Sequence, residues 1–109
     1  MQIYRGATPT IKINVRSTID LSDVTALWAY IYQEGSIKVN KELSDVTIDT
    51  TNNRITLTLT QQDTLGLKAD MGALFQIRLL LDGVALVSPA TNIVVRETYK
   101  GGVISAGTT

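Results

Sequence analysis

The side chains of this chain that could perform chemistry are limited to carboxylates, hydroxyls and amines. Its 109 residues include no cysteine and no histidine. The absence of cysteine removes thiol nucleophiles, thiolate metal ligands and disulfides. The absence of histidine removes the commonest general base and metal ligand, so the usual Ser–His–Asp triad cannot form from this chain.

One group of oxygen-bearing side chains has the spacing of a calcium loop. Asp20 and Asp23, with Ser22 between them, could supply such ligands. No glycine separates them and no further acid follows closely, whereas short polar side chains commonly cap turns. We therefore predict a capping role for this group. Asp45 and Asp49 flank a short strand and are expected in solvent.

Paired carboxylates could also hydrolyse glycosides, which needs two acids a few ångströms apart, one of them with a raised pKa. The three glutamates and seven aspartates lie mostly in expected turns or on hydrophilic strand faces. No serine lies in a nucleophile elbow, and the glycine-rich end lacks the lysine of a phosphate-binding loop. The sequence predicts a protein that is not an enzyme, with no catalytic residue, no cofactor and no metal.

The overall charge narrows the classes of partner. Ten basic residues balance ten acidic residues, without a block of either sign. A basic stripe for nucleic acid is missing, and no apolar run approaches the roughly 20 residues of a membrane span. We expect neither nucleic acid nor membrane as a partner, which leaves other proteins or small ligands.

The stretch 54–81 predicts the architecture. Residues 54–60 alternate strictly, with Ile55, Leu57 and Leu59 on one face, which is typical of a half-buried strand. Residues 60–63 resemble a capping box, which predicts one helical turn at 61–65 that Gly66 ends in a left-handed conformation. Residues 73–81 form a second strand, whose core face is expected to carry Phe75, Ile77 and Leu79.

The rest of the chain has the same alternation, broken by turn signals every few residues. Ile37 and Val39 are expected to share one face of their strand, and Asp82-Gly83 predicts a hairpin turn. The predicted strands cover a short edge strand near residue 3, then 10–16, 26–33, 36–43, 46–49, 54–60, 73–81, 84–87 and 92–99.

About eight short strands and a single helical turn favour an all-β, immunoglobulin-like antiparallel β-sandwich, with a barrel as the rival. The domain is expected to span residues 1–100, followed by a flexible tail at 101–109.

One strand leaves its orientation open. Leu27, Ala29 and Ile31 share one face, and the aromatic residues Trp28, Tyr30 and Tyr32 share the other. A tryptophan on the third strand is a core residue in immunoglobulin domains. Two tyrosine hydroxyls favour the outward orientation, in which the aromatic residues would form an interface with a partner. Trp28, Tyr30 and Tyr32 are the candidate interface residues.

Three stretches together resemble a known family. They are Ile3-Tyr4-Arg5-Gly6-Ala7-Thr8-Pro9-Thr10, Ile31-Tyr32-Gln33-Glu34-Gly35 and Leu59-Thr60-Gln61-Gln62-Asp63-Thr64-Leu65. They are similar to the N-terminal immunoglobulin-like domain of baseplate upper proteins, from phages and prophages of Gram-positive bacteria. Ala7 stands where that family's first motif carries an acidic residue. The resemblance extends from Ile3 to about Tyr99.

The resemblance implies a structural adaptor of a phage tail or baseplate that acts through protein–protein contacts. Its partners would be other phage structural proteins, with a homo-oligomer left open. Its location would be the virion tail, or the host bacterial cytoplasm during assembly. The family brings no catalytic residues with it. The alternative is a carbohydrate-binding module in which Trp28, Tyr30 and Tyr32 stack on sugars.

Overall fold

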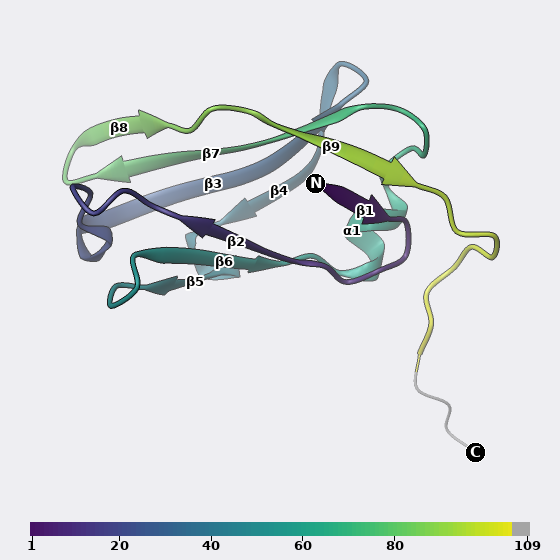
Figure 1. Cartoon of the computed structure of the whole chain (residues 1–109), viewed down its shortest axis with the longest axis horizontal. Helices are drawn as coiled ribbons and strands as arrows, with labels where there is room; N and C mark the ends of the chain where they lie inside the picture. Colours follow the sequence, from purple (N-terminus) through teal and green to yellow (C-terminus); the bar gives the residue numbers. More distant parts are fainter. Residues whose placement is uncertain (106–109) are drawn as a thin grey trace.

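The computed structural model describes residues 1–105 of the chain, and they form nine strands and a short α-helix (Figure 1). The predicted tail at 101–109 is therefore described only as far as residue 105. The elements are β1 (Gln2–Tyr4), β2 (Thr10–Asn14), β3 (Val24–Gln33), β4 (Ser36–Glu42), β5 (Val46–Asp49), β6 (Arg54–Thr58), α1 (Gln61–Leu65), β7 (Ala73–Leu81), β8 (Val84–Val87) and β9 (Thr91–Arg96).

The strands form two separate sheets. The larger has the order β1-β9-β7-β3-β4, with β8 pairing β7, and the smaller has the order β2-β6-β5. The larger sheet resembles the enlarged sheet of immunoglobulin variable-type sandwiches, whereas the smaller sheet has three strands in place of the four found there. The predicted all-β sandwich is confirmed. The antiparallel expectation fails at one place, because β1 runs parallel to β9.

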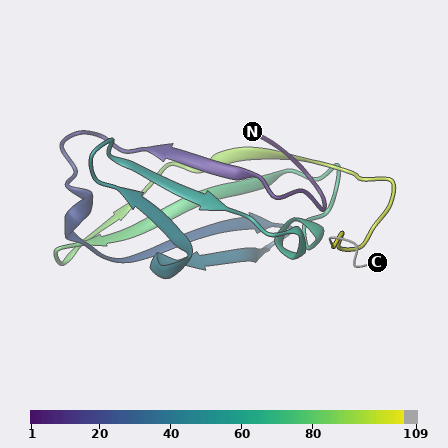
Figure 2. The same ribbon diagram turned by 90° about the horizontal axis from the view of Figure 1, so that it is seen from below.

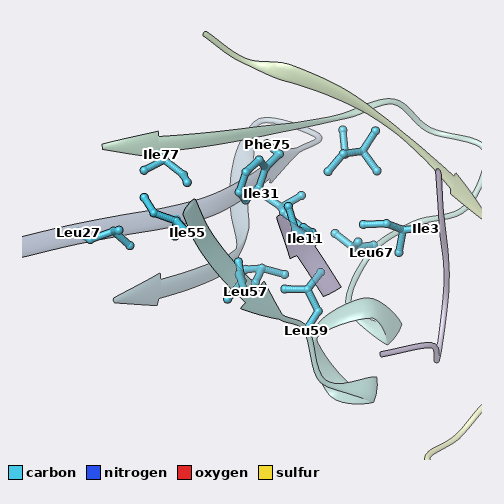
Figure 3. Packing of buried hydrophobic residues seen from close by; sticks show 14 of the residues in the cluster. Ile3, Ile11, Leu27, Ile31, Ile55, Leu57, Leu59, Leu67, Phe75 and Ile77 are labelled. Atoms are coloured by element: carbon cyan, nitrogen blue, oxygen red, sulfur yellow. The ribbon is translucent and has the colours of Figure 1, made fainter. Parts of the chain in front are cut away.

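The core lies between the two sheets, where both turn their apolar faces inward (Figure 3). Ile55, Leu57 and Leu59 are buried, as the alternation at 54–60 predicts. Phe75 and Ile77 are buried too, whereas Leu79 is only partly buried, so its assignment to the core is only partly right.

Helix α1 crosses from the smaller sheet to the larger at the end where the C-terminal segment leaves (Figures 1 and 2). Both hydrogen bonds of the predicted capping box form. The Asp63 amide donates to Thr60 Oγ1 at 3.1 Å, and the Thr60 amide donates to Asp63 Oδ2 at 2.8 Å. The expected left-handed end is wrong: Gly66 has φ −73° and ψ −10°, which is right-handed. The chain continues in a tight turn in which the Leu67 amide donates to the Thr64 carbonyl.

Asp63 also pairs with Lys41 of β4, whose Nζ lies 2.8 Å from Asp63 Oδ2. Burial raises the pKa of Asp63, but the hydrogen bonds from Lys41 and Thr60 lower it more, so its pKa lies below the ordinary 3.8. A carboxyl group with a lowered folded-state pKa stabilises the fold above its unfolded pKa, and this contribution is lost as the pH falls through the folded value.

We predict that Asp63→Asn loses about 1 kcal/mol of stability at pH 7, the usual contribution of a helix cap. The difference from the wild type should shrink as the pH falls below the ordinary pKa of 3.8, because the unfolded chain then takes up the proton first and the native carboxyl follows only at lower pH. Urea unfolding at pH 7 and at pH 3 measures both. Asp23→Asn removes the same charge at an exposed site and is the control. A difference that stays constant from pH 7 to pH 3 would contradict this reading of the ion pair.

The hairpin of β3 and β4 contains a β-bulge that overturns one expectation. Val39 pairs with Ile31, but Ile37 pairs with Tyr32, because the register shifts by one residue between these two pairs. Val39 is consequently buried in the core, and Ile37 lies on the opposite face, 49% exposed. The predicted shared face is wrong, because an extra residue in one strand reverses the side-chain alternation that follows it.

Two 3₁₀ helices, Leu21–Asp23 and Leu43–Asp45, correct the expectation that the helical turn at 61–65 stands alone. Asp20 caps the first of them, since its Oδ1 accepts hydrogen bonds from the backbone amide and the hydroxyl of Ser22. This is the capping role predicted for that group.

The first and third of the three stretches singled out in the sequence meet at α1. The Arg5 guanidinium donates to the carbonyl oxygens of Leu65 and Leu67, at 3.0 and 2.8 Å. The buried Thr64 hydroxyl accepts from the Gly6 amide and donates to the Ala7 carbonyl. These residues fasten the N-terminal turn to the helix, so the motifs belong to the construction of the sandwich.

Candidate functional site: the outer face of the larger sheet

The candidate interface lies on the side of the larger sheet that points away from the core. Alternation along β3 buries Leu27, Ala29 and Ile31, so their neighbours point outward. We call the outward positions of β3, β4 and β7 the aromatic face. Its residues are Ala26, Trp28, Tyr30 and Tyr32 on β3, Ile37, Asn40 and Glu42 on β4, and Leu74, Gln76, Arg78 and Leu80 on β7.

The structure resolves the open orientation of the aromatic stripe. Trp28 is 47% exposed and Tyr32 is 43% exposed, while Tyr30 is partly buried. The tryptophan of this third strand is therefore a surface residue, unlike the core tryptophan of antibody domains. A tryptophan that is half exposed on a flat sheet can act as an anchor for a partner.

Side chains on neighbouring strands hold the aromatic residues in place. The Arg78 guanidinium carbon lies 5.1 Å from the centroid of the Trp28 ring, which is a cation–π distance. The Tyr30 hydroxyl donates to Gln76 Oε1 at 2.6 Å, and Gln76 Nε2 donates to the Ser88 carbonyl at 2.9 Å. These contacts restrict the rotamers before any partner binds, which lowers the entropy lost on association.

Exposed apolar side chains lie at the two ends of this face, with Ile37 and Leu74 beside Tyr32 and Leu80 near Trp28. Ile37, Leu74 and Leu80 are 49%, 38% and 40% exposed. A depression of about 200 Å³ lies beside Trp28, with Leu80 and Ala85 in its lining. Exposed apolar and aromatic side chains that gather on one face mark an interaction site more often than scattered ones do.

A larger hollow of about 730 Å³ opens at the side of the sandwich, between the edge of β2 and the segment from β8 to β9. Ile13, Val15 and Leu86 contribute to its apolar wall, with Lys12 and Arg16 at its rim. Its lining includes no aspartate or glutamate. Its lining is mostly apolar, and its polar members include Asn14, Ser88 and Thr91 as well as the two basic residues.

The carboxylates are engaged in structural contacts. Hydrogen bonds to Ser22, Lys68, Asn52 and Arg5 lower the pKa values of Asp20, Glu34, Asp49 and Glu97, in that order. A glycosidase acid needs the opposite shift. Within residues 1–105, no three residues of the types His, Cys, Asp and Glu lie close enough together to hold a metal ion. The same part of the chain has no helix that is both long and apolar enough to cross a membrane.

Sequence reasoning missed part of the aromatic face. The alternation at 36–43 places Ile37 on the same face as Val39, and only the bulge brings it beside Tyr32. The stacking of Arg78 on Trp28 was missed as well, although the alternation at 73–81 puts Arg78 on the hydrophilic face. A scan against protein-family models and a search of curated proteins both find no match to this chain.

Proposed function

We propose that this protein is a non-enzymatic structural component of a phage or prophage tail or baseplate, and that it assembles through protein–protein contacts of the aromatic face. The observation that carries the proposal is the exposure of Trp28 and Tyr32 on one face, with Arg78 stacked on Trp28 and the exposed Ile37 and Leu74 beside Tyr32. Tryptophan, tyrosine and arginine are the residue types that dominate binding energy at protein interfaces. The resemblance of the three stretches to baseplate upper proteins supplies the tail context. The partners are other phage structural proteins, met in the virion or in the host cytoplasm during assembly.

The alternative is a carbohydrate-binding module, which would stack sugar rings on Trp28. Arg78 already lies over the face of the Trp28 ring, and Tyr30 and Gln76 bond to each other. A sugar would need a free ring face and polar groups directed at its hydroxyls.

Incorporation into particles tests the proposal. Tail or virion particles from a host that carries the gene would be separated on a density gradient, and the chain measured in the particle band by mass spectrometry. We expect the wild-type chain in that band and at least a tenfold loss for the double variant W28A/Y32A, because truncating two central anchors costs more than about 2 kcal/mol of binding. Thr47→Ala, an exposed change on the smaller sheet, is the matched control and should assemble normally.

Two results would contradict the proposal. One is a wild-type chain that is missing from the particles. The other is glycan-array binding that disappears in Trp28→Ala, which would favour the carbohydrate alternative.

A further inference from the structure

We infer that the partner of the aromatic face is a second copy of this chain, packed face to face about a two-fold axis that runs along β3. The inference rests on the proposed function, because it specifies one of the contacts through which the component assembles. A two-fold rotation about an axis parallel to β3 places each cross-strand row of one copy opposite the same row of the second copy. It also reverses the left-to-right order of the residues in that row. Residues of β4 in one copy then face residues of β7 in the other. Each of the three rows that cross these strands can be examined for self-complementarity.

The first row carries the face's one acid and one base, on opposite sides of Trp28. Glu42 pairs with Trp28 from β4, and Arg78 pairs with Trp28 from β7. Reversal of the row places each Glu42 opposite Arg78 of the second copy, and the two tryptophans meet at the axis. Packed sheets are about 10 Å apart, a gap that an arginine and a glutamate span together. A two-fold axis that left the order of this row unchanged would place Glu42 opposite Glu42 and Arg78 opposite Arg78.

The other two rows are complementary in the same sense. Asn40 and Gln76 flank Tyr30, so reversal sets one amide against another. Gln76 already accepts from Tyr30 and donates to Ser88, which leaves one N–H and one lone pair of its amide for this contact. Ile37 and Leu74 flank the next tyrosine, and reversal sets one exposed aliphatic side chain against another. Acid meets base, amide meets amide and aliphatic meets aliphatic in the three rows. A face evolved for an unrelated partner would not need to match itself in every row.

The size of the face suits a small dimer interface. The ten residues of β3 extend about 33 Å, and the three strands β4, β3 and β7 together span about 14 Å, which gives a plan area of roughly 450 Å². The projecting side chains raise the accessible area toward the roughly 600 Å² per partner at the lower end of the range for specific interfaces.

The edge next to this face is poorly suited to joining copies. β4 is an edge strand with a bulge in its pairing to β3, and its Lys41 turns toward Asp63 on the core side. Bulges and inward charges are features that prevent edge-to-edge pairing of sheets. Association on this side of the molecule is therefore expected through the flat face.

A charge exchange between two variants tests the dimer with the isolated protein. Glu42→Arg gives a chain with two bases in the central row, and Arg78→Glu gives a chain with two acids. Each variant alone would place like charges together twice across the two-fold axis, and we expect its dimer to dissociate about 100-fold more readily than that of the wild type.

An equimolar mixture of the two variants restores opposite charges at both contacts. The arginine introduced at position 42 of one chain lies opposite the glutamate introduced at position 78 of the other. At the second contact, the unchanged Arg78 of the first chain faces the unchanged Glu42 of the second. The mixture should therefore recover a 1:1 heterodimer.

Sedimentation velocity gives the association constants, and native mass spectrometry separates the heterodimer from either homodimer by mass. Circular dichroism should show the wild-type β-sheet spectrum for each variant. Lys12→Glu, which reverses a charge on the smaller sheet, should leave dimerisation unchanged. A wild type that is monomeric at millimolar concentration, single variants that dimerise like the wild type, or a mixture that stays monomeric would each overturn the inference.

These outcomes are separate from those of the proposed function. A monomeric protein that enters tail particles would overturn the dimer and support assembly through a different partner. A dimer whose chain is missing from particles would support the dimer and overturn the tail assignment.

Discussion

Gln33→Leu is expected to destabilise the fold by about 3 to 5 kcal/mol. The Gln33 side chain is 1% exposed and makes three hydrogen bonds with backbone groups after α1. Its Nε2 donates to the carbonyl oxygens of Lys68 and Met71, at 2.8 and 3.0 Å, and its Oε1 accepts from the Lys68 amide at 2.7 Å. Leucine occupies similar space but leaves these backbone groups without their partner, at about 1 to 3 kcal/mol for each buried one.

Urea unfolding of Gln33→Leu and of Gln62→Leu would check this expectation. Gln62 is exposed on α1, so the same substitution there should change stability by less than about 0.5 kcal/mol. Gln33→Glu is a second probe, because a carboxylate facing two carbonyl oxygens should also unfold more readily at neutral pH than in acid. A loss below about 1 kcal/mol in Gln33→Leu would mean that the connection at 66–72 does not depend on this side chain.

The second large effect is expected at Phe75, the one phenylalanine of the chain. It is 4% exposed and lies in the core near Ile31 (Figure 3). Phe75→Ala removes a ring from a packed interior and should cost about 3 to 5 kcal/mol. Leu74, the preceding residue, is 38% exposed on the aromatic face, so Leu74→Ala should cost less than about 1 kcal/mol.

The pair Phe75→Ala and Leu74→Ala separates the two faces of one strand by two kinds of measurement. Thermal or urea unfolding should respond to Phe75→Ala, and self-association should respond to Leu74→Ala. Equal stability losses in the two variants would mean that the assignment of the faces of β7 is wrong.

Most of the sandwich could be predicted from local patterns. The alternation at 73–81 gave the bounds of β7, and the threonine–aspartate spacing gave the capping box of α1. Asp82-Gly83 forms the expected hairpin turn, with positive φ values of 46° and 81°, which suit the twist of two antiparallel strands. Such signals lie within a few residues of the feature they specify, so they can be recognised in a single sequence without knowledge of long-range contacts.

What could not be predicted depends on contacts between distant parts of the chain. The bulge that turns Ile37 outward is a property of the pairing between β3 and β4, and each strand alone alternates regularly. Gln33 has the same parity as Ile31, which indicates an inward position, but a polar residue at a strand end is more often found in solvent. Only the fold brings the carbonyl groups of Lys68 and Met71 to it.

The aromatic face was predicted in composition but not in orientation. Trp28, Tyr30 and Tyr32 face one way, and Leu27, Ala29 and Ile31 face the other, and both sets are apolar enough for a core. Which of the two faces of β3 is buried depends on the sheet that packs against it. A strand with two apolar faces can bury one of them inside its own domain, and the second then remains for a contact outside it.

The parallel pairing of β1 with β9 has a consequence for the way the protein forms in the cell. Gln2 pairs with Val94 and Tyr4 with Arg96, so the first of the nine strands to leave the ribosome pairs with the last. The β3–β4 hairpin can form early, because its strands are adjacent in the chain. The larger sheet cannot close until all nine strands have been synthesised, since contacts between distant residues form slowly and after local ones. During that interval the nascent chain exposes both the inner surface of β3 and its aromatic face, and it is then most dependent on chaperones.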